Sequence, residues 1–455
     1  LPGIDPQSKV MVADFLGNGT ACIVWSSPLP QYANAPMRYV DLMGGKKPFL
    51  MTTYRNGMGK SVTVQYKQST KYYLEDRLAG KEWATKLPFP VHCVEKITTA
   101  DAVSETQYTQ LFSYHHGYYD HEEREFRGFG RVETIDTDKA VIDETTSLDQ
   151  HPVLTKTWYH TGAWMRDRTL HEAFEAEYYP TTWAELPKAP WLEDPLNPQE
   201  QREAYRALKG QPLRQEVYGM DGSSLAGVPY AVTTNAYAVK KIQPLSDNRY
   251  ASFISYQRET LSWSAERDVA DPRVAHQLTL EVDPLGNVLR SATIAYPRVS
   301  IPIGTPVKVA EIQQKMLATY TINQYTNDVM TGGYHLRVAY EAITYELTGI
   351  STTDPLWTCE ALNTAIAGAT QIGYTDTPSA TAAEIRPVNH TRTLFQDNAC
   401  TGTLALGTIA SLALPYTQYT LAFTDGILTH TDYYDGRVTG AMLTEGGYLR
   451  EDTIP

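Results

Sequence analysis

The 455-residue chain predicts a mainly β protein, with an extended antiparallel sheet and a few short helices. Its 31 tyrosines against 10 phenylalanines suit strands that bury one face while the phenol oxygen reaches solvent or a polar partner. Short β-type runs separated by Gly, Asn and Pro indicate strands joined by tight turns. A chain of this length exceeds what a single core normally holds, so we expect several domains or one multi-sheet structure.

The first elements follow from turn chemistry. Residues 10–25 predict a hairpin, because two apolar runs flank the Gly-Asn-Gly turn at 17–19. Pro28, Pro30 and Pro36 then interrupt the pattern and predict a module boundary near residues 26–37. The strands expected downstream cover residues 49–54, 60–66, 91–97, 108–118, 131–136, 213–218, 230–239, 249–256, 277–282, 319–325, 335–348, 404–413, 416–424 and 427–434.

Helices are predicted in few places. Residues 198–210 have the clearest signals, because Pro198 opens the segment and Gly210 closes it. A second helix is expected over 355–367 with Asp354 as its N-cap. Residues 72–78 and 82–87 are weaker candidates for short helical turns. No fixed repeat period is present, which excludes a regular repeat array.

The composition excludes several classes of partner. A net charge of -13 with no basic block gives no electrostatic footprint for nucleic acid or anionic lipid. No run of about 18 apolar residues predicts a membrane span, and the start has no signal-peptide pattern, so we expect a soluble excerpt of a longer protein. Four widely spaced cysteines predict free, mostly buried thiols: Cys22, Cys93, Cys359 and Cys400.

The polar segment 114–123 has the residue types of a metal or acid/base site. Consecutive residues of a strand point to opposite faces, so His115 and His116 are not expected to ligate one ion. We expect instead a polar strand edge that runs into a charged turn.

The loop at residues 14–19 resembles an oxygen-rich calcium loop, and Asp14 and Asn18 are the candidate ligands. Leu16 stands where a further oxygen donor is needed, which favours a metal-free turn. We therefore predict no metal and no cofactor, with Asp14 and Asn18 kept as a calcium candidate.

Sequence motifs of catalysis are absent. The chain has no GxSxG, HExxH, GxxxxGK or helix-opening GxGxxG pattern. Acidic pairs such as Glu122 with Glu123, or Glu175 with Glu177, lack any sign of the raised and lowered pair that a glycosidase needs. No catalytic residue is assigned, and we predict that the chain is not an enzyme.

Several segments together resemble one family, the B component of bacterial Tc (toxin complex) insecticidal toxins, whose middle region is related to SpvB-type and Rhs/YD-repeat proteins. The stretch from His-His-Gly-Tyr-Tyr-Asp at 115–120 to Gly-Phe-Gly-Arg at 128–131 carries the most specific likeness. The other matching segments lie at residues 12–19, 54–59, 158–162, 207–210, 271–276 and 283–287, in the order expected for the family.

The resemblance implies a role by position in a secreted toxin. An FG-GAP-type β-propeller of the family docks on the pentameric A-component channel, while the rest of the B component joins the C component in a hollow cocoon around a cytotoxic C-terminal cargo. Residues 1–30 would then be the end of the propeller, and residues 31–184 a first β shell segment. Residues 185–300 would be a helix-containing linker and shell segment, and residues 301–455 further shell leading toward the YD repeats. The C component with its enclosed toxic domain and the A-component channel are the implied partners.

Two alternatives stay open. A carbohydrate-binding or glycoside-processing β module would suit the Trp and Tyr content, and it predicts an exposed cleft with aromatic rings beside two carboxylates. A cytotoxic enzyme such as an ADP-ribosyltransferase needs an Arg, a Ser-Thr-Ser-like strand and a Glu-x-Glu turn in order, and Glu175-Ala176-Glu177 supplies only the last.

Overall fold

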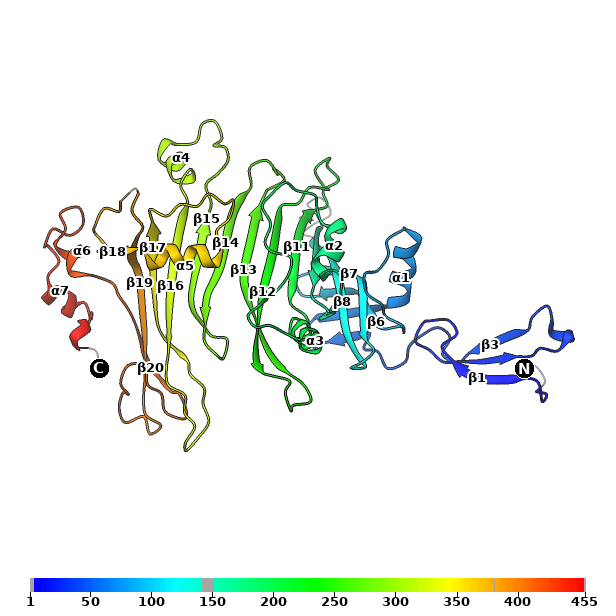
Figure 1. Ribbon diagram of the computed structural model, residues 1–455. Coiled ribbons are helices and arrows are strands. Elements are labelled where there is room, and N and C mark those ends of the chain that lie inside the picture. Colours follow the sequence, from blue (N-terminus) through cyan, green and yellow to red (C-terminus); the bar gives the residue numbers. More distant parts are fainter. Residues whose placement is uncertain (1–3, 141–150, 380, 454–455) are drawn as a thin grey trace.

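A computed structural model describes residues 4–140, 151–379 and 381–453. The described strands form one sheet of three strands and one of 17 strands. The ribbon is elongated, with the small N-terminal sheet projecting from one end of the large sheet and the C-terminal helices at the opposite end (Figure 1). The prediction of a mainly β fold with a large antiparallel sheet is confirmed.

The small sheet is an antiparallel meander of β1 (Lys9–Ala13), β2 (Cys22–Ser26) and β3 (Met37–Asp41). The predicted first hairpin is confirmed as β1 and β2. The central strand β2 is largely buried, whereas β1 and β3 are mostly exposed. Because β3 pairs along the whole of β2, this sheet extends past residue 30.

The large sheet follows the chain almost strand by strand. Antiparallel pairing runs from β4 to β9, from β9 to β11, through β12 to β17, and then to β19 and β20. The short strands β10 and β18 add parallel pairs to β12 and β19. The registers end at β4 and β20, so the described sheet is open.

The bounds of its strands are β4 (Thr53–Arg55), β5 (Lys60–Gln68), β6 (His92–Asp101), β7 (Thr106–Asp120), β8 (Glu125–Ala140), β9 (Val153–Tyr159), β10 (Trp191–Leu192), β11 (Pro212–Gly219), β12 (Ala231–Gln243), β13 (Ser252–Ser264), β14 (Arg273–Val282), β15 (Val288–Ala295), β16 (Leu317–Tyr325), β17 (Ala339–Thr348), β18 (Thr370–Gln371), β19 (Glu384–Phe395) and β20 (Pro415–Thr420).

Short helices lie between the strands, and Figure 1 shows α2, α3 and α5 on the same face of the large sheet. The helices are α1 (Ser69–Leu78), α2 (Leu170–Phe174), α3 (Pro198–Arg206), α4 (Val307–Gln313), α5 (Cys359–Ala367), α6 (Asp425–Thr429) and α7 (Gly440–Glu445). Three-residue 3-10 turns cover Pro30–Tyr32, Glu175–Glu177 and Glu451–Thr453. The predicted helices near 72–78 and 198–210 are confirmed as α1 and α3.

Four local predictions are wrong. Residues 82–87 contain no helix, and α5 begins after Thr358, whose hydroxyl caps the amide of Ala361, instead of after Asp354. Residues 404–413 contain no strand, because Gly407 has a positive φ of 79° that interrupts an extended run. Residues 427–434 hold α6 in place of a strand, since the Thr424 side chain accepts the amide of Ile427 and starts a helical turn.

Burial alternates along the central strands. His276 and Leu278 of β14 are buried beneath the helices, while Ala275 and Gln277 between them are exposed. One face of the sheet is therefore covered by α2, α3, α5 and their flanking loops, and we call it the helix-covered face. Its largest apolar cluster lies under α5.

All four cysteines are free, and three of them are buried: Cys22, Cys93 and Cys359. Cys400 is exposed, so the prediction of free, mostly buried thiols is confirmed. Burial raises the pKa of the Cys93 thiol to about 12, so this side chain is an inert core residue. Within the described residues, no helix has the length and apolar character to cross a membrane.

Candidate functional site at the β7–β8 hairpin

The hairpin of β7 and β8 presents the richest polar constellation of the chain. Its register shifts between Gly117 and Tyr119, where Gly128 on the opposite strand takes a φ of 88°. The turn is closed by the Asp120 carboxylate, which accepts the amides of Glu122 at 3.0 Å and Glu123 at 3.1 Å. The bulge and the turn together place a row of acidic side chains at the hairpin tip.

Arg127 fixes the base of this tip. Its buried guanidinium donates to the Gly162 carbonyl at 2.9 Å and contacts Asp120 at 2.8 Å and Glu125 at 3.2 Å. Burial raises the pKa of Asp120, but the Glu123 amide and the Arg127 charge outweigh it and hold the pKa below its usual range. The tip is thus a fixed anionic surface at neutral pH.

Helix α3 supplies the matching cations. Its start is specified locally, because Asn197 accepts the amides of Gln199 and Glu200 while the Glu200 side chain reaches back to the Asn197 amide. Pro198 occupies the first turn, where its missing N–H costs nothing. The helix then presents Arg202 and Arg206 toward the hairpin tip, and Lys209 reaches the tip from the turn that follows the helix.

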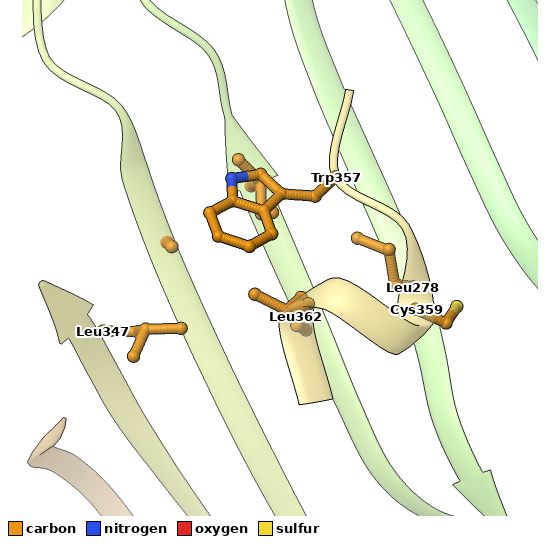
Figure 2. Close-up of a cluster of buried hydrophobic side chains, with 8 residues drawn as sticks. Leu278, Leu347, Trp357, Cys359 and Leu362 are labelled. Atoms are coloured by element: carbon orange, nitrogen blue, oxygen red, sulfur yellow. The ribbon is translucent and has the colours of Figure 1, made fainter. Parts of the chain in front are cut away.

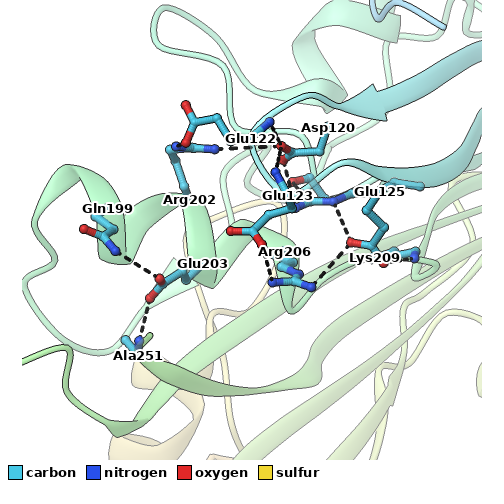
Figure 3. Close-up of polar contacts among 12 residues, drawn as sticks. Asp120, Glu122, Glu123, Glu125, Gln199, Arg202, Glu203, Arg206, Lys209 and Ala251 are labelled. Carbon is cyan, nitrogen blue, oxygen red and sulfur yellow. Dashed lines mark hydrogen bonds and ion pairs between the residues drawn. The ribbon is translucent and has the colours of Figure 1, made fainter. Parts of the chain in front are cut away.

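Opposite charges meet in register between the two elements (Figure 3). Arg202 pairs with Glu122, and Arg206 lies 3.8 Å from Glu123. Lys209 lies 2.8 Å from Glu125, and its hydrogen bond, ahead of other charges, lowers the pKa of that carboxyl. We call this set of contacts between residues 120–127 and residues 202–209 the charge clasp.

A cleft of about 390 Å³ lies beside the charge clasp. Tyr118 and Trp164 line it together with the carboxylates of Asp120, Glu122 and Glu203. The aromatic rings and acids expected for a sugar site are therefore close together. However, Arg127 holds the pKa of Asp120 below its usual range, whereas the acid that cleaves a glycoside needs a raised pKa, and Glu122 is paired with Arg202.

The two adjacent histidines lie inside the protein, so the expected polar strand edge is wrong. His116 has a φ of 57°, which departs from the extended backbone that sends neighbouring side chains to opposite faces. His115 Nδ1 lies 2.5 Å from Asp76, and His116 Nε2 lies 2.9 Å from Glu177. Each ring therefore engages its own carboxylate.

Glu177 gathers the buried network beneath α2. Its carboxylate receives hydrogen bonds from Arg131 at 2.8 Å and from the Trp158 indole at 3.0 Å, in addition to His116. Burial raises the pKa of Glu177, but the bonds and charges of His116 and Arg131 outweigh it and bring the pKa to about 2. These contacts hold α2 and the turn that follows it against β7, β8 and β9. The network therefore has a structural role.

The calcium candidate forms a self-contained turn. Asp14 accepts the amides of Asn18 at 3.0 Å and Gly19 at 2.8 Å, and Asn18 accepts the Thr20 amide at 3.0 Å. The side-chain oxygens of both proposed calcium ligands therefore already accept hydrogen bonds from backbone amides. Among the described residues, no group of three or more His, Cys, Asp or Glu side chains is arranged to hold a metal ion.

Sequence reasoning missed the contributions of Glu177 and of the α3 cations. In the sequence Glu177 stands out only as an acidic neighbour of Glu175, and its partner His116 lies 61 residues away. The charge clasp had a readable signal, because an acidic tip at 120–125 faces a basic periodic helix surface at 202, 206 and 209.

Two protein-family models match parts of the chain. The family model described as "Insecticide toxin TcdB middle/N-terminal region" matches residues 1–162, and that of the "middle/C-terminal region" matches residues 203–338. A search of curated proteins gave no match.

Among solved structures, TcdB2-TccC3 is 25% identical with a TM-score of 0.75, covering 96% of this chain and 21% of that chain. TcdB2-TccC3-Cdc42 is 25% identical with a TM-score of 0.74, covering 97% and 21%. The Tc holotoxin pore of Photorhabdus luminescens is 25% identical with a TM-score of 0.73, covering 99% and 21%. The chain thus spans about a fifth of the length of the structures it matches.

The open sheet and the two matched regions define a structural component of an insecticidal toxin complex. The chain belongs to the Tc toxin B-component family and corresponds to the middle region of that component. The resemblance found in the sequence is confirmed. The charge clasp joins the two matched regions, since its acidic tip lies in the first and Arg206 and Lys209 lie in the second.

Proposed function

We propose that this chain is a non-catalytic wall segment of a secreted Tc toxin B component. With the C component it would form a hollow cocoon that encloses a cytotoxic cargo. The observation that carries the proposal is the large sheet itself, which runs from β4 to β20 in nearly unbroken chain order. A sheet of this length must curl, close or pair its edges to avoid aggregation, and a shell built with further strands does so.

The small N-terminal sheet supports a link to a β-propeller. Its outer strands β1 and β3 carry large exposed apolar side chains, namely Val10, Met11, Val12, Met37, Tyr39 and Val40. Such residues on both outer strands of one small sheet call for another layer of protein. We propose that residues 1–30 are the last part of an FG-GAP-type propeller, which in turn docks on the A-component channel.

The proposed partners are the C component with its enclosed toxic domain and, through the propeller, the A-component channel. Similar solved structures contain TcdB2 together with TccC3, and one contains a Tc holotoxin pore. The ion pairs of the β7–β8 hairpin support a structural use of its acidic side chains, because arginine and lysine are paired with them.

Protection of the cargo from protease tests the proposal. The full parent B chain is co-expressed with its C component, with and without residues 31–455, and both preparations are digested and imaged. We expect intact cargo and hollow particles from the full pair, and digested cargo from the deletion. Equal digestion of cargo in the two preparations, with the full pair assembled, would contradict a wall role.

A second candidate, carbohydrate binding, is favoured by Tyr118 and Trp164 beside carboxylates in the cleft. Aromatic faces can stack on sugars without any glycoside cleavage. A glycan array with the wild-type chain and a Trp164→Ala variant separates the two functions. Binding of a defined glycan by the wild type, which the variant loses, supports this candidate. An array on which neither protein binds a glycan rejects it.

A further inference from the structure

The sequence contains two Asn-Gly pairs, Asn18–Gly19 and Asn56–Gly57, and both lie in turns between paired strands. The side chain of Asn carries an amide carbon that the main-chain nitrogen of the next residue can attack. Glycine permits this attack best, because it has no Cβ to crowd the approach. Whether the attack occurs in the folded chain depends on exposure and on the hydrogen bonds of the two amides.

The turn between β4 and β5 leaves the Asn56–Gly57 pair open to water. All residues from 51 to 60 are exposed, and a Cβ built on Gly57 would have no heavy atom within 4 Å. Among the described residues, the Gly57 amide has no hydrogen-bond acceptor. The attacking nitrogen is therefore accessible, and its approach breaks no hydrogen bond of the fold.

Two backbone donors hold the side-chain oxygen of Asn56. Its Oδ1 accepts the amide of Met58 at 2.8 Å and the amide of Lys60 at 3.0 Å. Negative charge develops on Oδ1 when the Gly57 nitrogen attacks the side-chain carbon. Amides that already point at this oxygen stabilise the charge without reorganisation. The turn therefore favours the attack both by access and by electrostatics.

The Asn18–Gly19 pair has a different environment. The Gly19 amide donates to the Asp14 carboxylate at 2.8 Å, so the nitrogen that would attack is already engaged. A Cβ built on Gly19 would stand 2.5 Å from the His92 ring, and the Asn18 side chain is half-buried. Folding should therefore protect Asn18, whereas it leaves Asn56 reactive.

We propose that Asn56 is a site of spontaneous chemical modification, at which the folded chain exchanges a side-chain amide for a carboxylate with water as the co-reactant. The Gly57 nitrogen gives up its proton and bonds to the side-chain carbon of Asn56. The bond from that carbon to the side-chain nitrogen breaks, ammonia leaves with the proton, and a five-membered cyclic imide remains. Water then opens the ring. Cleavage at the side-chain carbon gives aspartate, cleavage at the main-chain carbon gives isoaspartate, and no step oxidises or reduces the chain.

The products change the hairpin of β4 and β5. Each product adds a negative charge, and isoaspartate also lengthens the main chain by one carbon atom between two paired strands. β4 is paired with β5 through three residues, Thr53, Tyr54 and Arg55. Because the turn fixes the register of so short a strand, the extra atom should loosen this pairing. The modification is independent of the proposed shell role.

Mass spectrometry of the full chain tests the proposal. The folded chain and the chain unfolded in guanidinium chloride are kept in mildly alkaline water labelled with heavy oxygen, and peptides containing Asn18 or Asn56 are followed over time. We expect Asn56 of the folded chain to react at least ten-fold faster than Asn18 and to gain one heavy oxygen atom. Unfolding should remove the difference, because both pairs then lose their environments.

Two variants sharpen the assignment. Gly57→Ala places a Cβ beside the attacking nitrogen and should slow the reaction at Asn56 at least ten-fold. Alanine is strained at the Gly57 φ of 73°, so circular dichroism checks the fold of this variant, and the wild-type comparison does not depend on it. Asn56→Asp adds the charge without the extra main-chain atom, and it should melt at a higher temperature than wild type rich in isoaspartate.

Equal rates at Asn18 and Asn56 in the folded chain, or no heavy oxygen at Asn56, would overturn the proposal. Equal melting temperatures of Asn56→Asp and the isoaspartate form would overturn the loosening of β4. Protection of the cargo is measured separately, so neither result decides the shell role.

Discussion

Helices α5 and α3 cover the same face of the large sheet, yet different forces hold them. Beneath α5, Leu362 and Trp357 are buried against Leu278, Ile294 and Leu347 of three strands (Figure 2). Among its apolar side chains, helix α3 buries only Ala204, and Leu208 in the turn that follows the helix is buried beside it. Its other contacts are the ion pairs of the charge clasp.

The difference separates stability from selectivity. Apolar burial is strong and non-directional, so the α5 cluster stabilises the sheet whatever the salt concentration. Ion pairs at a partly exposed surface contribute little free energy, but they discriminate between right and wrong neighbours and weaken with salt. The charge clasp therefore fixes which hairpin α3 meets, at the junction of the two matched family regions.

The largest expected effect comes from emptying the α5 cluster. Leu362 is fully buried, so Leu362→Ala should lower the free energy of unfolding by about 2–5 kcal/mol through lost burial and a residual cavity. Urea denaturation followed by circular dichroism measures the change. Thr364→Ala on the exposed side of α5 is the control, and equal destabilisation by the two variants would contradict the packing argument.

Acid should destabilise the chain through two buried histidines, His160 directly after β9 and His171 in α2. Burial, then the charge of His171, lowers the pKa of His160 to about 3. Burial, then Arg214 and Lys188, lowers the pKa of His171 to about 4, although Glu175 opposes the shift. Neither ring nitrogen of His171 has a hydrogen-bond partner among the described residues.

The pKa of each histidine in the folded chain lies below its value of 6.5 in the unfolded chain. Each neutral histidine therefore makes its full contribution to the free energy of unfolding above pH 6.5. That contribution falls by about 1.4 kcal/mol per pH unit per group as the pH drops from 6.5 toward 4. Unfolding free energies measured at pH 7, 6 and 5 should show this slope, and His171→Phe should halve it. An unchanged slope in the variant would assign the acid sensitivity to other groups.

Reversal of one clasp charge should have a smaller and salt-dependent effect. Lys209→Glu places two carboxylates together with Glu125, and we expect a loss of about 1 kcal/mol at low salt that fades in 1 M NaCl. Lys209→Met, which removes the charge and adds no second carboxylate, should cost less, because Glu125 keeps Arg127 and Arg206 as partners. A loss in Lys209→Glu that 1 M NaCl does not reduce would show that Lys209 acts by packing and not by charge.

Calcium should have the smallest effect. Since Asp14 and Asn18 already accept backbone amides, millimolar CaCl2 should leave the melting temperature of the wild type unchanged. Asp14→Ala should lower it equally with and without calcium. A calcium-dependent rise in the wild type that the variant lacks would instead establish a metal site.

Local signals predicted those elements whose cause lies within a few residues. Asn197, Pro198 and Glu200 specify the start of α3, and the Gly-Asn-Gly turn specifies the first hairpin. The prediction failed where a distant contact or a single backbone angle determines the local structure. Residues 404–413 look like a strand, but Gly407 turns the chain with its α-carbon packed near the Tyr340 ring.

The candidate site could be predicted only in its parts. Sequence reasoning singled out the polar segment 114–123, but it placed the two histidines on an exposed edge. The left-handed backbone of His116 and the contact of its ring with Glu177 bury the His116 side chain. Neither feature can be read from the local sequence pattern. The charge clasp differs, because its acidic run and its basic residues are each visible in the sequence, whereas their pairing across about 80 residues is not.

The sequence by itself determined the β class, the family and most strand positions, because alternation and turn residues act over short distances. Only the tertiary structure decided which face of the sheet is covered by helices and which carboxylate each histidine meets. Those properties depend on register between strands. A shift of one residue would exchange every inward and outward side chain, so composition cannot settle them without the pairing.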